Sequence, residues 1–330
     1  MIKLFFTPIF LTITSLLFAQ SYNAPESVDY HVGTNSFLVS NSGNGQILSD
    51  DGLGNLNILA TGVGAGPHGL EVIGDLVYAC SGGRLKAYNV LNGNQTLNHN
   101  INGQFLNGIT HKGNDIFITD FSGKKLYRYN ILSDNHNLFA SFNSTPNGVV
   151  YDYLLDRLIV VGWGGGAPIW EVNLSDSSVS VLANTNHSNI DGVAIDPCGN
   201  YYVSVWGNNA IYQYDSNFSS PQILATGQSQ PADIFYENNS QTLAIPNSGN
   251  NTVNFISINC TPSNIEEGYE EKANYISNNY LYCEEGLKSL YNTNGQLVWE
   301  KSASKINIED VPAGIYILKS NTQSEKIYID

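Results

Sequence analysis

The stretch IDGVAIDPCGNYYVSVWGNNAIYQYD, residues 190–215, decides the fold, because it contains three short strands joined by tight turns. An Asp-Gly pair opens the first strand, and glycine turns such as Gly207-Asn208 separate the others. Such turns supply the positive φ angles that tight hairpins need. The same alternation of apolar and polar residues recurs at residues 115–120 and 125–129, which is typical of strands packed on neighbouring layers.

This unit is repeated along the chain, and each copy opens on an equivalent position, which we call the pivot. The pivots are Ser27, Gly69, Gly108, Gly148, Gly192 and Asp233, and the four glycines lie 39, 40 and 44 residues apart. The string ILATG also occurs twice, at residues 58–62 and 223–227. Six units of about forty residues predict an all-β, six-bladed β-propeller. The sixth copy has no clear fourth strand, and the sequence leaves open whether residues 21–25 supply it.

Composition and charge agree with this fold and exclude one class of partner. The chain has 330 residues, of which 42% are hydrophobic, only 13% are charged and 31 are glycine, as expected for a turn-rich β protein. The net charge is −15, and the 14 Lys and Arg residues are spread along the chain. Nucleic-acid binding needs clustered cationic side chains, so it is excluded, and divalent cations become the more plausible ligands.

The first twenty residues predict export. Lys3 precedes an apolar run that ends at Ala19-Gln20, the pattern of a secretory signal peptide. No other segment has about eighteen continuous apolar residues, the length that a membrane helix needs. We expect a mature chain without a transmembrane segment, monomeric, and secreted or held at the cell surface after passage through the periplasm.

The four cysteines are far apart and match no metal-binding CxxC pattern. They are Cys80, Cys198, Cys260 and Cys283. The sequence leaves two alternatives open: buried thiols, or at most one or two disulfides.

The residues just before the pivots are candidate ligands. The innermost strand of a propeller blade starts at one face of the disc, so these residues should surround one mouth of the central channel. Two carboxylates and two amide oxygens among them suit calcium. The alternative is that Asn or Asp before Gly reflects ordinary turn chemistry. The six residues are Glu26, His68, Asn107, Asn147, Asp191 and Ala232.

The turns after the second strands should lie at the same mouth. They contribute Asn41, Ser81, Asp120, Trp163, Trp206 and Asn247. Trp163 and Trp206 could stack on a sugar or another flat ligand, or simply pack on each other. His68 could act as an acid or base, or be a hydrogen-bonded structural histidine. The sequence has none of the GxSxG, P-loop, HExxH or strand-linked GxGxxG motifs.

The ordered repeats resemble the family of regucalcin (SMP-30), gluconolactonase and the luciferin-regenerating enzyme. The resemblance covers residues 24–258 and implies a six-bladed propeller with calcium in the channel that hydrolyses lactone-like or ester substrates. Matching positions imply that the metal ligands are Glu26, Asn107, Asn147 in TPNGVV and Asp191 in IDGVAID. Phe105 stands where sugar-lactone members often have Arg, which speaks against an anionic sugar substrate. Recognition propellers of the NHL class, which bind ligands or surfaces without catalysis, are the alternative.

The family resemblance implies a mechanism in which the cation polarises a carbonyl group. Asp191, or a water that it orients, would deliver the nucleophile, and His68 is the second catalytic candidate. The expected ligand is a small molecule or carbohydrate, and the residues expected to contact it are Phe105, Asp120, Trp163 and Trp206.

The repeat pattern ends at Ile258. We expect the propeller to span residues 21–259, a linker residues 260–272, and a small β-sandwich-like domain residues 273–330. The end of the chain, LYNTNGQLVWEKSASKINIEDVPAGIYILKSNTQSEKIYID at residues 290–330, resembles the C-terminal sorting domain of the Bacteroidetes type IX secretion system. This implies that the secretion machinery is a partner and that the tail is removed from roughly residue 262 onward. A small Ig-like accessory domain is the alternative, because Asn-Gly hairpins occur in any sandwich.

Overall fold

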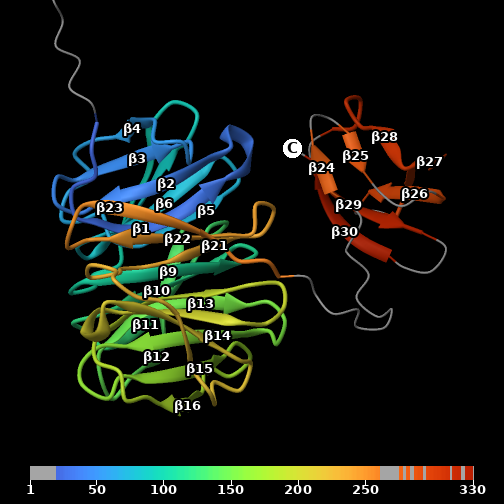
Figure 1. Cartoon of the computed structure of the whole chain (residues 1–330). Coiled ribbons are helices and arrows are strands. Elements are labelled where there is room, and N and C mark those ends of the chain that lie inside the picture. Colours follow the sequence, from blue (N-terminus) through green and yellow to red (C-terminus); the bar gives the residue numbers. More distant parts are fainter. Residues whose placement is uncertain are drawn as a thin grey trace, which may run out of the picture. The chain divides into compact units, whose positions relative to one another are not determined.

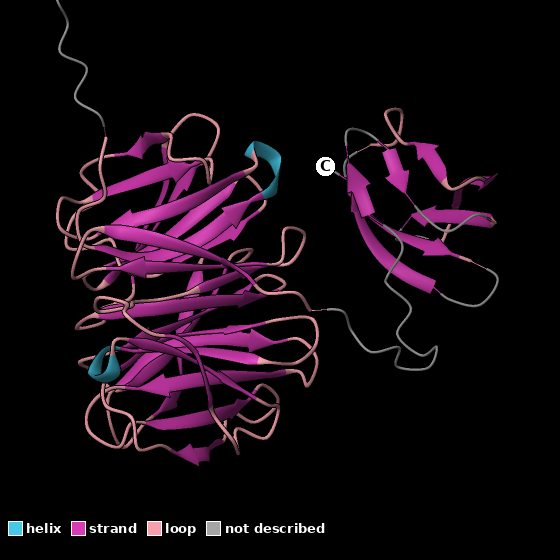
Figure 2. Cartoon of the chain, in the orientation of Figure 1, coloured by secondary structure: helices cyan, strands magenta, loops and turns pink. Residues whose placement is uncertain are grey.

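A computed structural model describes residues 20–260, 275–277, 280–282, 286–292, 295–312, 314–320 and 324–329. The chain divides into two compact units, residues 1–262 and 263–330. Residues 1–19 of the predicted signal peptide, residues 261–272 of the predicted linker, and Cys283 lie outside the described residues. The described secondary structure is strand, apart from two single turns of 3₁₀ helix, η1 (Val32–Thr34) and η2 (Trp206–Asn208) (Figure 2). None of the described helical turns has the length or hydropathy to span a bilayer.

Residues 25–257 form six antiparallel sheets, and in each sheet the strands are hydrogen-bonded in chain order. Blades one to five have four strands each and blade six has three. Blades one and two are β1 (Pro25–His31), β2 (Ser36–Asn41), β3 (Gln46–Asp50), β4 (Leu56–Ala60), and β5 (Leu70–Ile73), β6 (Leu76–Ser81), β7 (Arg84–Asn89), β8 (Gln95–Asn100). Blades three and four are β9 (Leu106–Lys112), β10 (Asp115–Asp120), β11 (Lys125–Asn130), β12 (Asn135–Ser141), and β13 (Pro146–Asp152), β14 (Arg157–Gly162), β15 (Pro168–Asn173), β16 (Val179–Asn184). Blades five and six are β17 (Ile190–Ile195), β18 (Tyr201–Val205), β19 (Ala210–Tyr214), β20 (Gln222–Ala225), and β21 (Phe235–Glu237), β22 (Thr242–Asn247), β23 (Thr252–Ser257).

Burial falls from the first strand of a blade to the last. Every residue of β17 is buried, whereas β20 in the same blade has only half-buried and exposed residues. The first strands therefore line the central channel, and the fourth strands form the rim. Apolar clusters fill the space between neighbouring blades, as Ile159 of blade four and Val203 of blade five illustrate. The chain is thus a six-bladed β-propeller, as the repeats predicted.

The pivots of blades two to five are glycines because the backbone of the next blade lies too close to admit a side chain. A Cβ atom built on Gly108 would lie 2.5 Å from the carbonyl oxygen of Asn147, and one on Gly148 would lie 2.5 Å from that of Asp191. Any larger residue would therefore collide with the backbone of the next blade. Gly108 and Gly148 lie inside β9 and β13 rather than in turns. Turn chemistry therefore does not explain the polar residues that precede them.

Blade six meets blade one at the two pivots that are not glycine. Ser27 and Asp233 form a parallel bridge, the backbone N–H of Asp233 donates to the Glu26 carbonyl at 2.8 Å, and the Ser27 hydroxyl donates to Asp233 Oδ2 at 2.9 Å. Figure 1 shows β22 beside β1 at this seam. Residues 21–24 do not complete blade six, because the carbonyls of Asn23 and Ala24 accept hydrogen bonds from the turn after β2.

A disulfide ties the last segment of the propeller to blade five. Cys198 lies in the turn between β17 and β18, and Cys260 follows β23, 62 residues later. Cys80 is a buried free thiol. Both alternatives for the cysteines therefore occur in the described part of the chain.

The second unit is a small β-sandwich. One sheet has the order β24 (Tyr275–Ser277), β25 (Tyr280–Tyr282), β28 (Lys305–Asn307), and the other has the order β27 (Leu297–Ser302), β26 (Leu287–Asn292), β29 (Gly314–Lys319), β30 (Ser324–Ile329). Leu281 and Ile306 from the first sheet share a core with Leu290 and Leu318 from the second. Gly295, at φ 76°, donates to the Asn292 carbonyl at 2.9 Å in the β26–β27 turn, as the hairpin prediction requires. The predicted all-β fold, a propeller followed by a sandwich-like domain, is confirmed.

Candidate functional site

The residues before the pivots meet at one mouth of the channel. Asn107 on β9 donates a side-chain N–H to the Asn147 side-chain oxygen on β13, and Asn147 donates to the Ile190 carbonyl at 3.2 Å. His68 Nδ1 lies 3.7 Å from Glu26 Oε1. Asp191 on β17 lies close enough to Glu26 for that carboxylate to raise its pKa. All five polar candidates therefore belong to one ring, and Ala232 closes it as a buried apolar residue.

Two buried carboxylates dominate the electrostatics of this ring. Burial raises the pKa of Asp191 well above its usual 3.8, and the charges of Glu26 and Asp233 raise it further. The neighbouring side chains of Asn147 and Trp206 act in the opposite direction and lower this pKa. Among the described residues at this mouth, Glu26 Oε2 and Asp191 Oδ1 are buried without a hydrogen-bond partner, as are the ring nitrogens His68 Nδ1 and Trp206 Nε1. An unpaired buried carboxylate is costly, and a cation bound between the two would remove that cost.

The donor set fits a hard divalent cation. Glu26 and Asp191 would supply two negative charges, and Asn107 and Asn147 are amides held at the same mouth by their mutual hydrogen bond. Calcium takes carboxylate and amide oxygens in flexible geometries, and two carboxylates balance its charge. The residues present are therefore suited to calcium.

An arc of half-buried aromatic rings borders the ring of polar residues. Trp163 and Trp206 have ring centroids 5.2 Å apart, Phe121 lies 5.8 Å from Trp163, and Phe105 lies 5.4 Å from Phe121. The His68 ring ends the arc, 4.6 Å from Phe105. The two tryptophans pack on each other, as one alternative predicted, and both are only half-buried, so stacking on a ligand stays a prediction. The arc is a wall for a flat or apolar part of a ligand.

Phe121 is an arc residue that the sequence reasoning missed. It directly follows β10, as Trp163 follows β14, and each donates its backbone N–H to the carbonyl two residues before the corresponding Asn of the ring. The sequence prediction that Asp120 is equivalent to Trp163 is wrong by one residue, because β10 ends at Asp120 and β14 ends at Gly162. The sequence contained a signal for Phe121, because the apolar alternation in residues 115–120 ends the strand there and places Phe121 in the following turn.

Asp120 has another role than touching a ligand. Its two oxygens accept backbone N–H groups of Gln104 at 2.9 Å, Phe105 at 2.9 Å and Gly123 at 3.0 Å. The side chain is buried, with 1% of the residue exposed. Asp120 is thus a positioning residue that holds the segment carrying Phe105.

Asp233 is a further acidic residue of the channel that the sequence reasoning did not assign. Burial raises its pKa well above the usual 3.8, and the Glu26 charge adds to this. The sequence carried a signal for it, because Asp233 is the one carboxylate at a pivot, where four repeats have glycine.

No protein-family profile and no curated protein matches this chain. Solved structures similar to the chain include a gluconolactonase from Xanthomonas campestris, with 15% identity, TM-score 0.59 and coverage of 68% of this chain and 83% of that one. A virginiamycin B lyase from Staphylococcus aureus has 14% identity, TM-score 0.54 and coverage of 72% and 85%. A nidogen/laminin complex contains a chain with 15% identity, TM-score 0.58 and coverage of 65% and 86%. At such identities the similarity shows the β-propeller fold.

Proposed function

We propose that the propeller binds calcium at the channel mouth through Glu26, Asn107, Asn147 and Asp191. The observation that carries this proposal is the pair of buried, unpartnered oxygens on Glu26 and Asp191. The same four positions carry the resemblance to the regucalcin and gluconolactonase family.

We further propose that this site hydrolyses lactones or activated esters. When bound, calcium would polarise the substrate carbonyl as a Lewis acid. Asp191 orients a water for attack, and His68, half-buried beside Glu26, exchanges a proton with the reacting oxygens. Phe105, Trp163 and Trp206 hold the rest of the substrate and exclude water from it. Phe105 offers no positive charge, so neutral acyl groups are preferred.

A panel of neutral and anionic lactones and aryl esters tests the hydrolase proposal. We expect turnover that a chelator abolishes, with neutral substrates ahead of anionic ones. Phe105→Arg should move that preference toward anionic substrates, because the cation would face the same pocket. Phe121→Leu serves as a matched change in the same arc that adds no charge, and it should leave the order of preference unaltered.

The panel also separates catalysis from recognition. If calcium binds and none of the substrates is hydrolysed, the chain is a ligand-binding propeller of the NHL-like kind and the hydrolase proposal fails.

We propose that the chain is exported and delivered by the type IX secretion machinery through residues 263–330. The Cys198–Cys260 disulfide supports an oxidising destination, since disulfides persist mainly outside the cytosol. In a host with this secretion system, the full chain should reach the surface or medium. A chain ending at Pro262, which keeps both cysteines, should remain in the periplasm; its appearance outside the cell would contradict the proposal. Fractionation and immunodetection measure both.

A further inference from the structure

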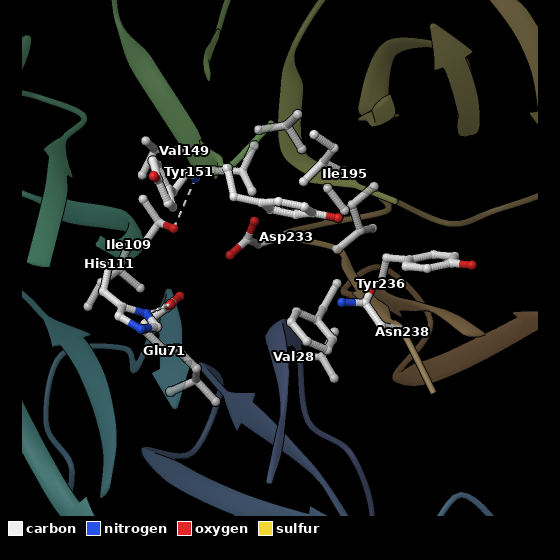
Figure 3. A pocket seen from close by; sticks show the side chains of 18 residues that line it. Val28, Glu71, Ile109, His111, Val149, Tyr151, Ile195, Asp233, Tyr236 and Asn238 are labelled. Atoms are coloured by element: carbon white, nitrogen blue, oxygen red, sulfur yellow. Dashed lines mark hydrogen bonds and ion pairs between the residues drawn. The ribbon is translucent and has the colours of Figure 1, made fainter. Parts of the chain in front are cut away.

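A second candidate binding site lies in the central channel, beyond the ring of polar residues at the mouth. It is a cavity of 310 Å³ lined by the six innermost strands (Figure 3). In blades one to five its wall begins one position after the pivot, as at Val28, Ile109 and Val149, and in blade six it includes the pivot Asp233 itself. Tyr153 is 40% exposed at its rim, so the cavity is accessible from solvent. The lining includes neither Glu26 nor Asp191, but the cavity adjoins their mouth of the channel, because the Asp233 N–H donates to the Glu26 carbonyl at 2.8 Å.

The cavity has apolar walls and one carboxyl group, that of Asp233, with which no Lys or Arg of the lining pairs. Figure 3 shows the Asp233 carboxylate in the middle of the view, among the side chains that line the cavity. The Ser27 hydroxyl donates to it at 2.9 Å. Glu71, the other carboxylate of the lining, is already paired with His111. The 18 lining residues include no Lys or Arg. A cationic group entering the cavity would therefore meet Asp233 without competition.

The shape and chemistry select an organic cation over a metal ion. Calcium needs six to eight oxygens, whereas here Glu71 is engaged by His111 and most of the wall is hydrocarbon. A wall of Val and Ile side chains gains free energy by covering an apolar ligand body. Tyr151, Tyr153 and Tyr236 add aromatic surface, which attracts cations as well as apolar groups.

We propose that this cavity binds a protonated primary amine with an apolar, preferably aromatic, body. The ammonium group pairs with Asp233, and the body lies against Val28, Ile109 and Val149. The proposal does not depend on calcium binding or hydrolysis at the ring of polar residues, and it is tested in the presence of a chelator.

The probe is 2-phenylethylamine, and calorimetric titration is the measurement. We expect saturable binding of one amine per chain. The neutral 2-phenylethanol and the anionic 3-phenylpropionate should bind about 10- to 100-fold more weakly, since a charge-assisted hydrogen bond is lost. Equal binding of the alcohol, or no saturable binding of the amine, would overturn the proposal.

Variants locate the site. Asp233→Asn keeps an acceptor for Ser27 and should weaken amine binding about 10- to 100-fold. Val150→Phe fills part of the cavity at a half-buried wall position and should also weaken it, without changing charge. Asp176→Asn, which removes a carboxylate from an exposed turn, is the matched control and should bind the amine as tightly as wild type. Denaturation curves show that each variant is folded. Undiminished binding in either Asp233→Asn or Val150→Phe would refute the location.

Discussion

Asp191→Asn should abolish the rise in melting temperature that calcium produces in the wild-type protein. A ligand that binds only the folded state adds about 2.7 kcal/mol of stability at a free concentration one hundred times Kd. The variant lacks one of the two charges of the site, so most of this gain should disappear. Thermal unfolding with calcium and with a chelator measures the difference. Asp176→Asn, which removes an equal charge from an exposed turn, should keep the full gain.

Without calcium, Asp191→Asn should raise the stability of the protein. The pKa of Asp191 is raised above 3.8 by burial and by the charges of Glu26 and Asp233. The folded, metal-free protein therefore holds a proton that the unfolded chain has lost, and its stability falls as the pH rises from 3.8 through the raised pKa. Asp191→Asn removes this penalty, so at neutral pH the chelated variant should be more stable than chelated wild type. Calcium stabilisation that persists in the variant would remove Asp191 from the site.

Loss of the Cys198–Cys260 disulfide should cost about 2–4 kcal/mol of unfolding free energy. The bond closes a loop across a sequence separation of 62 residues, so it removes much conformational freedom from the unfolded chain. It also holds the segment after β23, where Tyr236 donates to the Ile258 carbonyl at 2.9 Å and Gln241 to the Cys260 carbonyl at 3.0 Å. Urea unfolding of the Cys198→Ala/Cys260→Ala double variant measures the loss.

Reductant supplies the control for the disulfide. It should lower wild-type stability to the level of the double variant and leave the double variant unchanged. Cys80→Ala, at the buried free thiol, should keep the reductant effect. A double variant as stable as the oxidised wild type would show that the hydrogen bonds alone hold this segment.

Equivalence between repeats made the ring of polar residues at the channel mouth predictable. Because the pivots recur about every forty residues, Glu26, Asn107, Asn147 and Asp191 could be assigned to one mouth without any contact being known. The same comparison of repeats also caused the error in the predicted ligand contacts. The match of Asp120 with Trp163 was one residue out of register, and in a strand a shift of one residue exchanges a side chain that faces the site for one that faces away. For this reason the sequence prediction omitted Phe121 and named Asp120 as a ligand contact.

The sequence by itself determined the all-β class, the six blades and the ring at the mouth, because alternation and repeat length are local properties of a chain. The tertiary structure decided how the ring closes, which cysteines pair, and where the unrepeated side chains point. Asp233 shows the physical reason. At the four glycine pivots a Cβ would strike the next blade, but at the seam with Ser27 there is room for a carboxylate, and it faces the channel. Ser27 and Asp233 are 206 residues apart, and only the closure of the ring brings them together.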